Sequence, residues 1–458
     1  NFTHFIKYNT SKAGSTTDLV AYFFRRIFDI LKESGFMSLI GTNSISEGDT
    51  RETSLEEIIS KKGKINHANK SVKWPGEATL HVSLISINKA RTNSNIILNN
   101  QQVNHINSWL SENNNNIKPF NLIQIQKAYL GTTVYGKGFF LSNEEKNILI
   151  SADNRSSKNI KPFLNGDDIL NNPRSEFSRY VLYFQGQDIN KIRNDFQYLY
   201  NFAFSRIYEE RQKSTSKGRR EKWWLYTSPA DEIYKNINDL NFAIVTCFTS
   251  KYPSFTILDK NQIFSNAVVV ICSDKYSRFA ELQSNLHACW IQEYGSTLET
   301  RQRYAVSDCY NTYPFSKDYN KLEYIGEDYY SIRKNIQIDL NIGLTEFYNL
   351  FNNKNEFRNE FIEFRKSQSL LDNTVLEAYG WQDIALRHDF YEVDYLPEND
   401  RVRYTIHPDA RKEVLKRLLE LNHKIHEEEV AAGLWDKKKA VKKEKVVKKK
   451  GNVVNEPF

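Results

Sequence analysis

The sequence predicts an α/β chain that begins with half of a doubly wound sheet and continues into an α+β domain and a helical region. Three observations predict this order. Helical and strand patterns alternate between residues 17 and 88, short mixed patterns rich in aromatic residues follow up to about 315, and helical periodicity dominates beyond 330. With 458 residues, 40% of them hydrophobic, the chain is long enough for two or three domains with buried cores.

The first helix and strand are predicted by periodicity. In residues 17–33, "TDLVAYFFRRIFDILKE", apolar side chains recur at helical spacing behind a Thr17 or Asp18 cap. The run 36–40 is short and apolar on both faces, which predicts an inner strand of an α/β sheet. Ligands of open α/β sheets bind beyond the carboxyl ends of strands, so the polar loop 42–48, "TNSISEG", is predicted to border a site. A loop that only caps the next helix is an equally good interpretation of its composition.

The next elements complete half of a sheet. Residues 49–60 indicate a capped helix, and residues 64–89 alternate apolar and polar side chains around the turn "WPGE", which predicts two strands joined by a hairpin loop. A doubly wound domain needs further parallel strands, so we expect them upstream of Asn1. Met37 is the only methionine, which indicates that translation begins before Asn1 and that the chain is a fragment.

Composition divides the chain into five parts. Residues 1–95 hold the half-sheet, and the asparagine-rich stretch 96–118 is predicted to be a linker or insertion. An α+β domain is predicted over 119–330 and a helical region over 331–435. The tail 436–458 holds nine lysines against three acidic residues, so +6 of the net charge of +7 lies there, and it is predicted to be disordered.

Several classes of protein are disfavoured by what the sequence lacks. No stretch approaches about 20 uninterrupted apolar residues, and the first residues lack a signal-peptide pattern, so we expect a cytoplasmic protein without a membrane partner. The four cysteines include no pair at two-residue spacing, so no metal site is predicted. A glycine-rich phosphate loop and the H-E-x-x-H, G-x-S-x-G and kinase signatures do not occur either.

One basic stretch has the residue types that contact nucleic acid. From Arg206 to Lys222 seven cations face three glutamates, and the pair Trp223 and Trp224 follows. Cations suit phosphates or guanine edges, and flanking aromatic rings offer flat surfaces to a base or sugar. A solvated charged face is the other interpretation of this run.

The stretch 282–315 leaves its alternatives open. Arg301 and Arg303 suit phosphates but can equally pair with nearby glutamates. His287 and Cys289 suggest nucleophile chemistry, which also needs a base and an orienting group that converge in space. A core histidine is the better interpretation.

Taken in order, these stretches resemble the amino-methyltransferases of the type IIL restriction–modification (Mme-type) family and the related DISARM defence methyltransferases. "GSTTDLVAYFFRRIFDILKESGFMSLIGTNSISEGDTRE" and "WPGEATLHVSLISINK" resemble the segment that follows the family's catalytic motif. Five further stretches resemble the family's target-recognition domain: "KPFLNGDDILNNP", "RREKWW", "LQSNLHACW", "YGSTLE" and "RYAVSDCYNTYPF". The family's C-terminal helical region is similar to "LDNTVLEAYGW" and "RLLELNHKIHEEEVAAGL".

The resemblance implies a sequence-specific DNA adenine-N6 methyltransferase that uses S-adenosylmethionine in a prokaryotic restriction–modification or phage-defence system, with double-stranded DNA as its partner. In the family the cofactor loop and the Asn-Pro-Pro-aromatic motif precede the matched segment, and neither occurs here. The resemblance therefore implies no catalytic residue in this chain and an inactive fragment. The pocket for a flipped adenine would be bordered by a rim of Asn43, Ser44, Ser46 and Glu47.

The same resemblance turns the cations into candidate DNA contacts. The candidate contacts are the cations Arg206, Lys217, Arg219, Arg220, Lys222, Arg301 and Arg303, together with the aromatic Trp224, whereas Trp223 is held to be structural. The alternative function is a non-catalytic DNA specificity protein that docks onto a separate methyltransferase, such as an upstream half encoded by a split gene. An unpaired strand edge would make the isolated half-sheet prone to aggregate.

Overall fold

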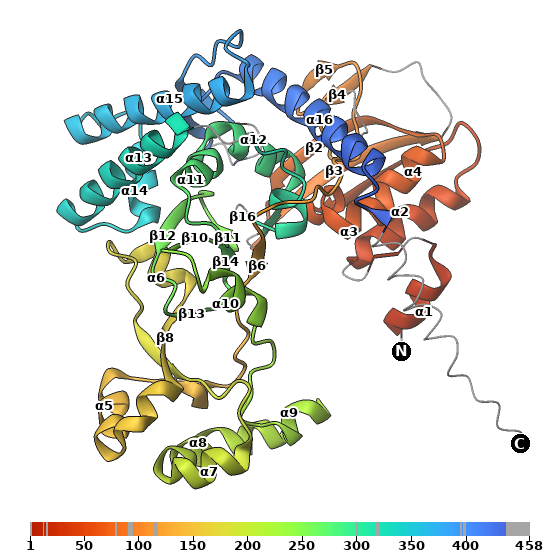
Figure 1. The fold of residues 1–458 in the computed structure, drawn as a ribbon. Helices are drawn as coiled ribbons and strands as arrows, with labels where there is room; N and C mark the ends of the chain where they lie inside the picture. Colours follow the sequence, from red (N-terminus) through yellow and green to blue (C-terminus); the bar gives the residue numbers. More distant parts are fainter. Residues whose placement is uncertain are drawn as a thin grey trace, which may run out of the picture.

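The computed structural model describes residues 2–11, 13–14, 17–77, 80–89, 95–112, 118–298, 301–316, 320–393, 396 and 400–436. They form a first sheet with its helices, a central region of small sheets and a helical region (Figure 1). The predicted lysine-rich tail lies outside the described residues except for Asp436. No helix in this part of the chain has the length and apolar character that a membrane span requires.

The first sheet has five strands in the order β1-β3-β2-β4-β5. They are β1 (Phe36–Thr42), β2 (Gly63–Lys73), β3 (His81–Lys89), β4 (Ile96–Leu98) and β5 (Gln101–Val103). Because β1 and β2 are both antiparallel to β3, they run in the same direction and end at the same edge. This edge is called the carboxyl edge below. The predicted hairpin around "WPGE" is confirmed as β2 and β3.

One face of the first sheet is covered by helices. These are α2 (Leu19–Ile30), α3 (Gly48–Arg51) and α4 (Glu57–Ser60), with a π-helical turn at Glu52–Glu56. The preceding α1 (Phe2–Asn9) lies away from the sheet (Figure 1). Ile85 and Ile87 of β3 pack with Phe24 and Phe28 of α2 in a buried cluster. The helices predicted at 17–33 and 49–60 are therefore confirmed.

Two features of the first sheet differ from the expectations. Although an inner strand was expected at 36–40, β1 lies at the end of the described sheet, and its Phe36 and Ile40 are 72% and 55% exposed. Part of the stretch expected to be a linker forms β4 and β5, and β4 pairs in parallel with β2 at His67 and Ala68. Strands of three residues are too short to show a periodic pattern in the sequence. They form here because β4 pairs with the edge of β2 and β5 pairs with β4.

Two small sheets are described in the central region, and the first of them lies in its hydrophobic core. The first has the order β12-β10-β14-β6, with β6 (Ala128–Leu130), β10 (Ala243–Cys247), β12 (Phe255–Leu258) and β14 (Val268–Ile271). The second has the order β11-β16-β15, with β11 (Thr249–Ser250), β15 (Ser296–Leu298) and β16 (Arg301–Arg303). Helices α10 (Asp231–Ile237), α11 (Tyr276–Gln283) and α12 (Asn285–Tyr294) accompany them. Every residue of β10 and β14 is buried, which explains their continuous apolar runs.

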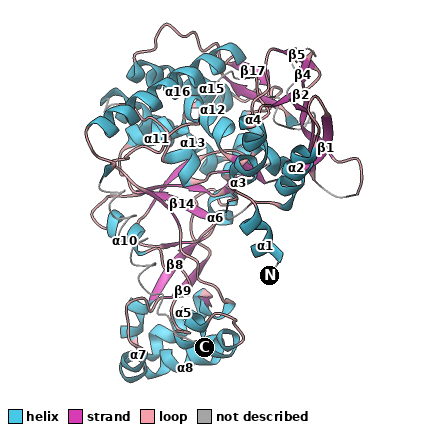
Figure 2. Cartoon of the chain, turned by 90° about the vertical axis from the view of Figure 1, so that its right-hand side faces the viewer, coloured by secondary structure: helices cyan, strands magenta, loops and turns pink. Residues whose placement is uncertain are grey.

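An outer lobe, residues 134–226, extends from the central region. Its strands β7 (Phe140–Leu141), β8 (Ile160–Leu164) and β9 (Arg179–Leu182) join β13 (Ile263–Phe264) in the order β13-β8-β9-β7. Its helices are α5 (Asn143–Ala152), α7 (Ile189–Asp195), α8 (Gln197–Gln212) and α9 (Lys217–Glu221), whereas α6 (Gly166–Asn171) packs on the central region with Ile169 in its core. Figure 2 shows β8 and β9 as a stem between α5, α7 and α8 and the rest of the molecule. The lobe has its own hydrophobic cluster, which includes Trp223.

The helical region packs on the central region. It comprises α13 (Asn320–Asp339), α14 (Leu344–Phe351), α15 (Asn359–Tyr379), β17 (Asp389–Glu392), β18 (Val402–Thr405) and α16 (Pro408–Ala431). A single hydrophobic cluster joins Val270 of β14 and Phe279 of α11 to Tyr329, Phe364 and Leu418 of these helices. The predicted domains 119–330 and 331–435 therefore share one core, and α13 runs across the boundary placed at 330.

Candidate nucleic-acid interface

The carboxyl edge of the first sheet holds the four residues predicted to form the rim. The Asn43 side chain donates to Ser71 Oγ of β2 (3.0 Å) and accepts from Ser83 Oγ of β3 (3.1 Å). Asn43 thus ties the loop after β1 to both neighbouring strands at the edge where open α/β sheets bind ligands.

The two rim serines are engaged within the same loop. Ser44 Oγ donates to Asp18 Oδ2 at the start of α2 (3.0 Å), and the buried Ser46 donates to the backbone oxygen of Asn43 (3.1 Å). These hydrogen bonds fix the loop. A contact of Ser44 or Ser46 with a flipped base stays a prediction.

Glu47 joins the first sheet to the central region. Its carboxylate accepts from the backbone N–H of Thr297 in β15 (2.9 Å) and from Thr297 Oγ1 (2.5 Å). Burial raises the pKa of Glu47, while the bonds to Thr297 and the charges of Lys70 and Arg303 oppose the rise. The β15–β16 hairpin is therefore attached to the predicted rim across 250 residues of sequence.

A polar pocket opens between this edge and the helical region. It is lined by Asn43 and Glu47 from the rim, Lys70 from β2, Lys251 from the central region and Arg403 from β18. The pocket lies where three parts of the chain meet, which is a common position for binding sites. Asp400 pairs with two of the lining cations, Lys251 (3.1 Å) and Arg403 (3.3 Å).

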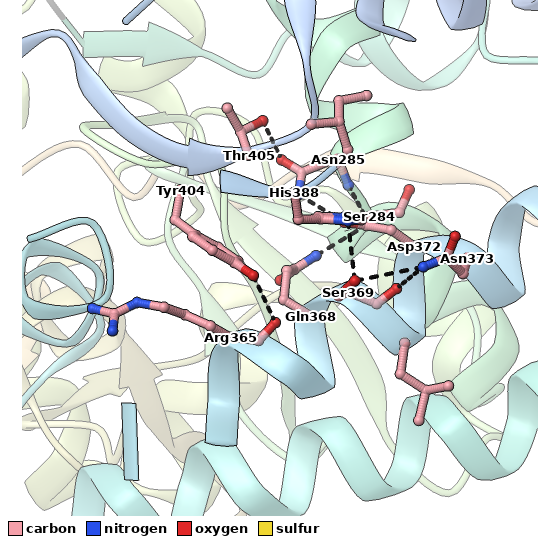
Figure 3. A network of polar contacts seen from close by, with 12 residues as sticks. Ser284, Asn285, Arg365, Gln368, Ser369, Asp372, Asn373, His388, Tyr404 and Thr405 are labelled. Carbon is pink, nitrogen blue, oxygen red and sulfur yellow. Dashed lines mark hydrogen bonds and ion pairs between the residues drawn. The ribbon is translucent and has the colours of Figure 1, made fainter. Parts of the chain in front are cut away.

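A buried carboxylate network braces the helical region behind this pocket (Figure 3). Asp372 of α15, which is wholly buried, accepts from the backbone and side chain of Asn285 (2.7 Å each) and from Gln368 (3.1 Å). His388 Nε2 lies 2.8 Å from Asp372 Oδ2, and its Nδ1 lies 3.0 Å from Ser369 Oγ. This serine, histidine and aspartate are in series, but the carboxylate is saturated by contacts that join α12, α15 and the segment just before β17. We therefore interpret the network as structural.

The basic run 206–222 of the outer lobe contains some arginines that are bonded within the lobe and other cations that lie nearer to solvent. Arg206 of α8 pairs with Glu145 of α5 (2.6 Å) and donates to the backbone oxygen of Phe140 (3.1 Å). Arg211 in the same run is fully buried and donates to the backbone oxygens of Val134 and Leu225. These two arginines hold the lobe together, which the sequence could not distinguish from a surface role.

The remaining predicted contacts of this run lie nearer to solvent. Lys222 is exposed, and Lys217 is exposed with Glu221 at 3.6 Å. The Arg219 guanidinium lies over the Tyr135 ring (4.1 Å), and Arg220 donates to the backbone oxygen of Ser214 (2.7 Å). The lobe therefore presents at most part of the predicted basic strip.

The two neighbouring tryptophans lie in different environments, and Trp223 is a core residue, as the sequence suggested. Trp223 is 6% exposed and packs edge-on against aromatic rings of α8. Trp224 is half-buried and donates its indole N–H to the backbone oxygen of Gln187 (3.1 Å). A DNA contact by Trp224 stays a prediction.

The second predicted group of cations lies on the β15–β16 hairpin. Arg301 is exposed, whereas the Arg303 guanidinium lies over the Phe248 ring at 5.1 Å. Because Thr297 of the same hairpin binds Glu47, Arg301 and Arg303 lie on an element that is fixed to the predicted rim. The outer-lobe cations belong to a different element of the fold.

The remaining chemical candidates are core residues. His287 is fully buried beside Tyr304 OH (3.0 Å), and burial lowers its pKa to about 3. Cys289 is also buried, and burial raises the pKa of its thiol to about 12, which disfavours the reactive thiolate at neutral pH. The interpretation of His287 as a core histidine is confirmed. In the described part of the chain no group of three or more histidine, cysteine or acidic residues is placed to hold a metal ion.

A further junction between the first sheet and the central region was not predicted. The Arg51 guanidinium lies 4.0 Å from the ring centre of Trp109, and Trp109 meets Tyr294 of α12 edge-on at 6.1 Å. Arg51 also donates to Ser108 (2.8 Å), and Lys70 donates to the backbone oxygen of Trp109 (2.9 Å). Arg51 carried no signal in the sequence beyond its place in a predicted helix.

Comparisons with known proteins agree with this arrangement. Residues 2–99 match the family model "MmeI, DNA-methyltransferase domain", and residues 115–317 match "MmeI, target recognition domain". A protein of Bacillus subtilis (strain 168), DNA methyltransferase A, is 23% identical over 296 residues, which are 61% of this chain and 32% of that protein. The structure of the type IIL restriction–modification enzyme MmeI in complex with DNA matches with a TM-score of 0.71 at 22% identity, over 92% of this chain and 55% of that chain.

The chain spans about a third of the length of the Bacillus relative and about half of the solved enzyme. The structural likeness establishes the fold from the first sheet to the helical region. Two models of one family match the first sheet and the central region in the same order along the chain. The chain belongs to the MmeI family and carries residues of its DNA-methyltransferase domain and its target recognition domain.

Proposed function

We propose that this chain is the DNA-reading part of an adenine-N6 methyltransferase of a prokaryotic restriction–modification or phage-defence system that acts on double-stranded DNA in the cytoplasm. The observation that carries the proposal is the bond between Glu47 and Thr297, which attaches a hairpin of the target recognition domain to the carboxyl edge of the methyltransferase sheet. The bases read by the target recognition domain would thereby lie at a fixed distance from the base that the methyltransferase domain methylates.

The proposed division of labour has a physical reason. A methyltransferase must extrude its target base from the duplex at a cost of a few kcal/mol. A separate domain that contacts phosphates and base edges can offset this cost and select the sequence. Lys217, Lys222 and Arg301 are the exposed members of the predicted set.

The cofactor of the proposed reaction is S-adenosylmethionine, but the residues of this chain do not fit a cradle for it. At the carboxyl edge Asn43, Ser44 and Glu47 are engaged by other residues of the chain. The sequence also contains neither a glycine-rich phosphate loop nor an Asn-Pro-Pro-aromatic motif. We therefore derive no step of methyl transfer from this chain and propose that it is inactive alone.

The proposal is tested by selecting bound duplexes from a random pool. We expect one short sequence to be enriched, because base-edge contacts discriminate by about 1–3 kcal/mol per good pair. Binding at low salt without any preferred sequence would contradict the proposed role in target recognition.

The candidate phosphate contacts are tested by salt dependence. Lys222→Ala and Arg301→Ala should each weaken binding to all duplexes and reduce the slope of log K against log salt by about 1. The control is Lys366→Ala, at an exposed lysine of α15 in the helical region. An unchanged slope in K222A or R301A would remove that residue from the interface.

A second candidate function is a non-catalytic specificity protein that docks onto a separate methyltransferase. The exposed Phe36 and Ile40 of β1 and Phe23 of α2 favour it, because they leave an apolar surface where a partner could complete the sheet. The source DNA decides between the two. An Asn-Pro-Pro-aromatic segment in the same reading frame supports one polypeptide, whereas a separate frame encoding that motif supports docking.

A further inference from the structure

The C-terminal helix α16 lies beyond both matched segments, which end at residues 99 and 317. Figure 1 shows α16 running across α12, and the two helices are in contact. Along its second half α16 meets residues 118–124, which lead from the first sheet into β6 and are called the connector here.

Asn422 makes the central contact between α16 and the connector. This side chain is fully buried, although asparagine is usually exposed. It accepts from the backbone N–H of Phe120 (2.8 Å) and donates to the backbone oxygens of Phe120 (2.9 Å) and Thr312 (2.6 Å). A single amide group thus holds both backbone polar groups of one connector residue and a carbonyl of the target recognition domain.

A second side chain, two turns further along α16, contacts the connector three residues after Phe120. Glu429 is 9% exposed, and its Oε1 accepts from the backbone N–H of Ile123 (2.7 Å). Its other oxygen accepts from the Trp435 indole N–H (2.9 Å), which fixes the carboxylate in place. Between these two contacts the Phe120 ring stacks on His426 with ring centres 4.2 Å apart.

The connector lies within the segment matched to the target recognition domain, and residues 311–313 of the same segment hold its opposite side. The backbone N–H of Leu122 donates to the backbone oxygen of Asn311 (2.8 Å), and Gln124 Nε2 donates to that of Tyr313 (2.9 Å). The backbone of the connector is therefore held from two sides, by α16 and by residues 311–313.

We propose that α16 is a clasp that fixes the connector, with Asn422 as its principal positioning residue. By holding residues 118–124, the clasp would set the orientation of the methyltransferase sheet relative to the target recognition domain before DNA binds. If the orientation of the two parts is fixed in advance, DNA binding does not have to include the free-energy cost of ordering them. The clasp would therefore favour the DNA sequence that both parts contact together. Its effect on DNA rests on the proposed function, whereas its effect on the connector does not.

Hydrogen exchange of the whole chain tests the connector directly. In Asn422→Ala we expect the amides of Phe120, Leu122 and Ile123 to exchange at least about tenfold faster, while the amides of β10 keep their protection. The control is Lys424→Ala, at an exposed position of the same helix, which should leave all of these rates unchanged. Unchanged connector exchange in N422A would overturn the clasp.

DNA binding tests the positioning role. With a duplex obtained by selection, N422A should bind the preferred sequence about tenfold more weakly while its affinity for unrelated duplex at the same salt stays the same. An equal loss for both duplexes would overturn the positioning role, because it would mean that Asn422 only supports folding. If the unaltered chain selects no sequence, the proposed function fails, and hydrogen exchange still decides whether the clasp exists.

A second variant guards against misfolding of N422A. Glu429→Ala removes one acceptor from the edge of the clasp and should increase exchange at Ile123 more than at Phe120. If N422A does not fold, the same two measurements on E429A decide. Faster exchange together with a selective loss of binding to the preferred sequence supports the clasp. If exchange and binding are both unchanged in E429A, the clasp is overturned.

Discussion

The first sheet is covered unequally at its two boundaries. At the carboxyl edge Glu47 holds Thr297, and Arg51, Trp109 and Tyr294 form a packed junction with the central region. At β1, the other boundary, the described chain supplies no further strand, and Phe36 and Ile40 are largely exposed.

The difference shows which interactions this chain completes by itself. Polar and aromatic contacts with precise geometry fix the junction with the target recognition domain. The exposed face of β1 presents the apolar Phe36 and Ile40, with Ser38 between them bonded to Ser86 of β3 (2.7 Å). Exposed apolar side chains of this kind are expected of a surface that another segment or chain covers. Three predictions distinguish the closed boundary from the open one.

The largest expected effect is on the closed boundary. Trp109 is 8% exposed, and Trp109→Ala should lower the free energy of unfolding by about 3–5 kcal/mol, as expected for a buried tryptophan. Urea unfolding followed by circular dichroism measures this. The matched control is Trp74→Ala in the "WPGE" turn, where Trp74 is 38% exposed and the expected loss is below about 1 kcal/mol. Equal losses would mean that the Trp109 junction is not an essential contact.

The next effect concerns Glu47 and depends on pH. Burial raises its pKa in the folded chain, so its protonated form favours folding, fully below about pH 4.5, and this contribution is lost as the pH rises through the folded pKa. Glu47→Gln is neutral at every pH. Its free energy of unfolding relative to the unaltered chain should therefore increase between pH 4 and pH 8, by about 1.4 kcal/mol per unit of pKa shift.

The control for this measurement is Glu77→Gln, at an exposed glutamate of the "WPGE" turn. Thermal unfolding at several pH values gives both differences, and that of E47Q is read relative to that of E77Q. A relative stability of E47Q that falls as the pH rises would contradict a raised pKa and would show that the ionised carboxylate stabilises the bond to Thr297.

The closed boundary also shows where sequence reasoning ends. Periodicity and the "WPGE" turn predict α2, β2 and β3, because helix and hairpin signals are local. The partner of Glu47 lies 250 residues away, and that of Arg206 lies 61 residues away. Charge in a sequence does not reveal such a partner, so Arg206 was expected to contact DNA although it braces the lobe. The loop that follows β1 does lie at the carboxyl edge, as the rule for open sheets predicts. That its residues border a base pocket stays a prediction, and their hydrogen bonds depend on strand pairing that the sequence leaves open.

The smallest effect on stability is expected at the open boundary, where association should change instead. Phe36→Lys and Ile40→Glu place charges on the exposed face of β1 and should alter the free energy of unfolding by less than about 0.5 kcal/mol. Both should reduce self-association, because charged residues on an edge strand prevent edge-to-edge pairing. Light scattering across a concentration series measures this.

Ser38→Lys, on the same face of β1, adds a charge without removing apolar surface, so a smaller reduction in S38K than in F36K would assign the self-association to the apolar side chains. An unaltered chain that stays monodisperse at every concentration would instead show that the β1 surface does not need a partner, and the docking function would lose its support.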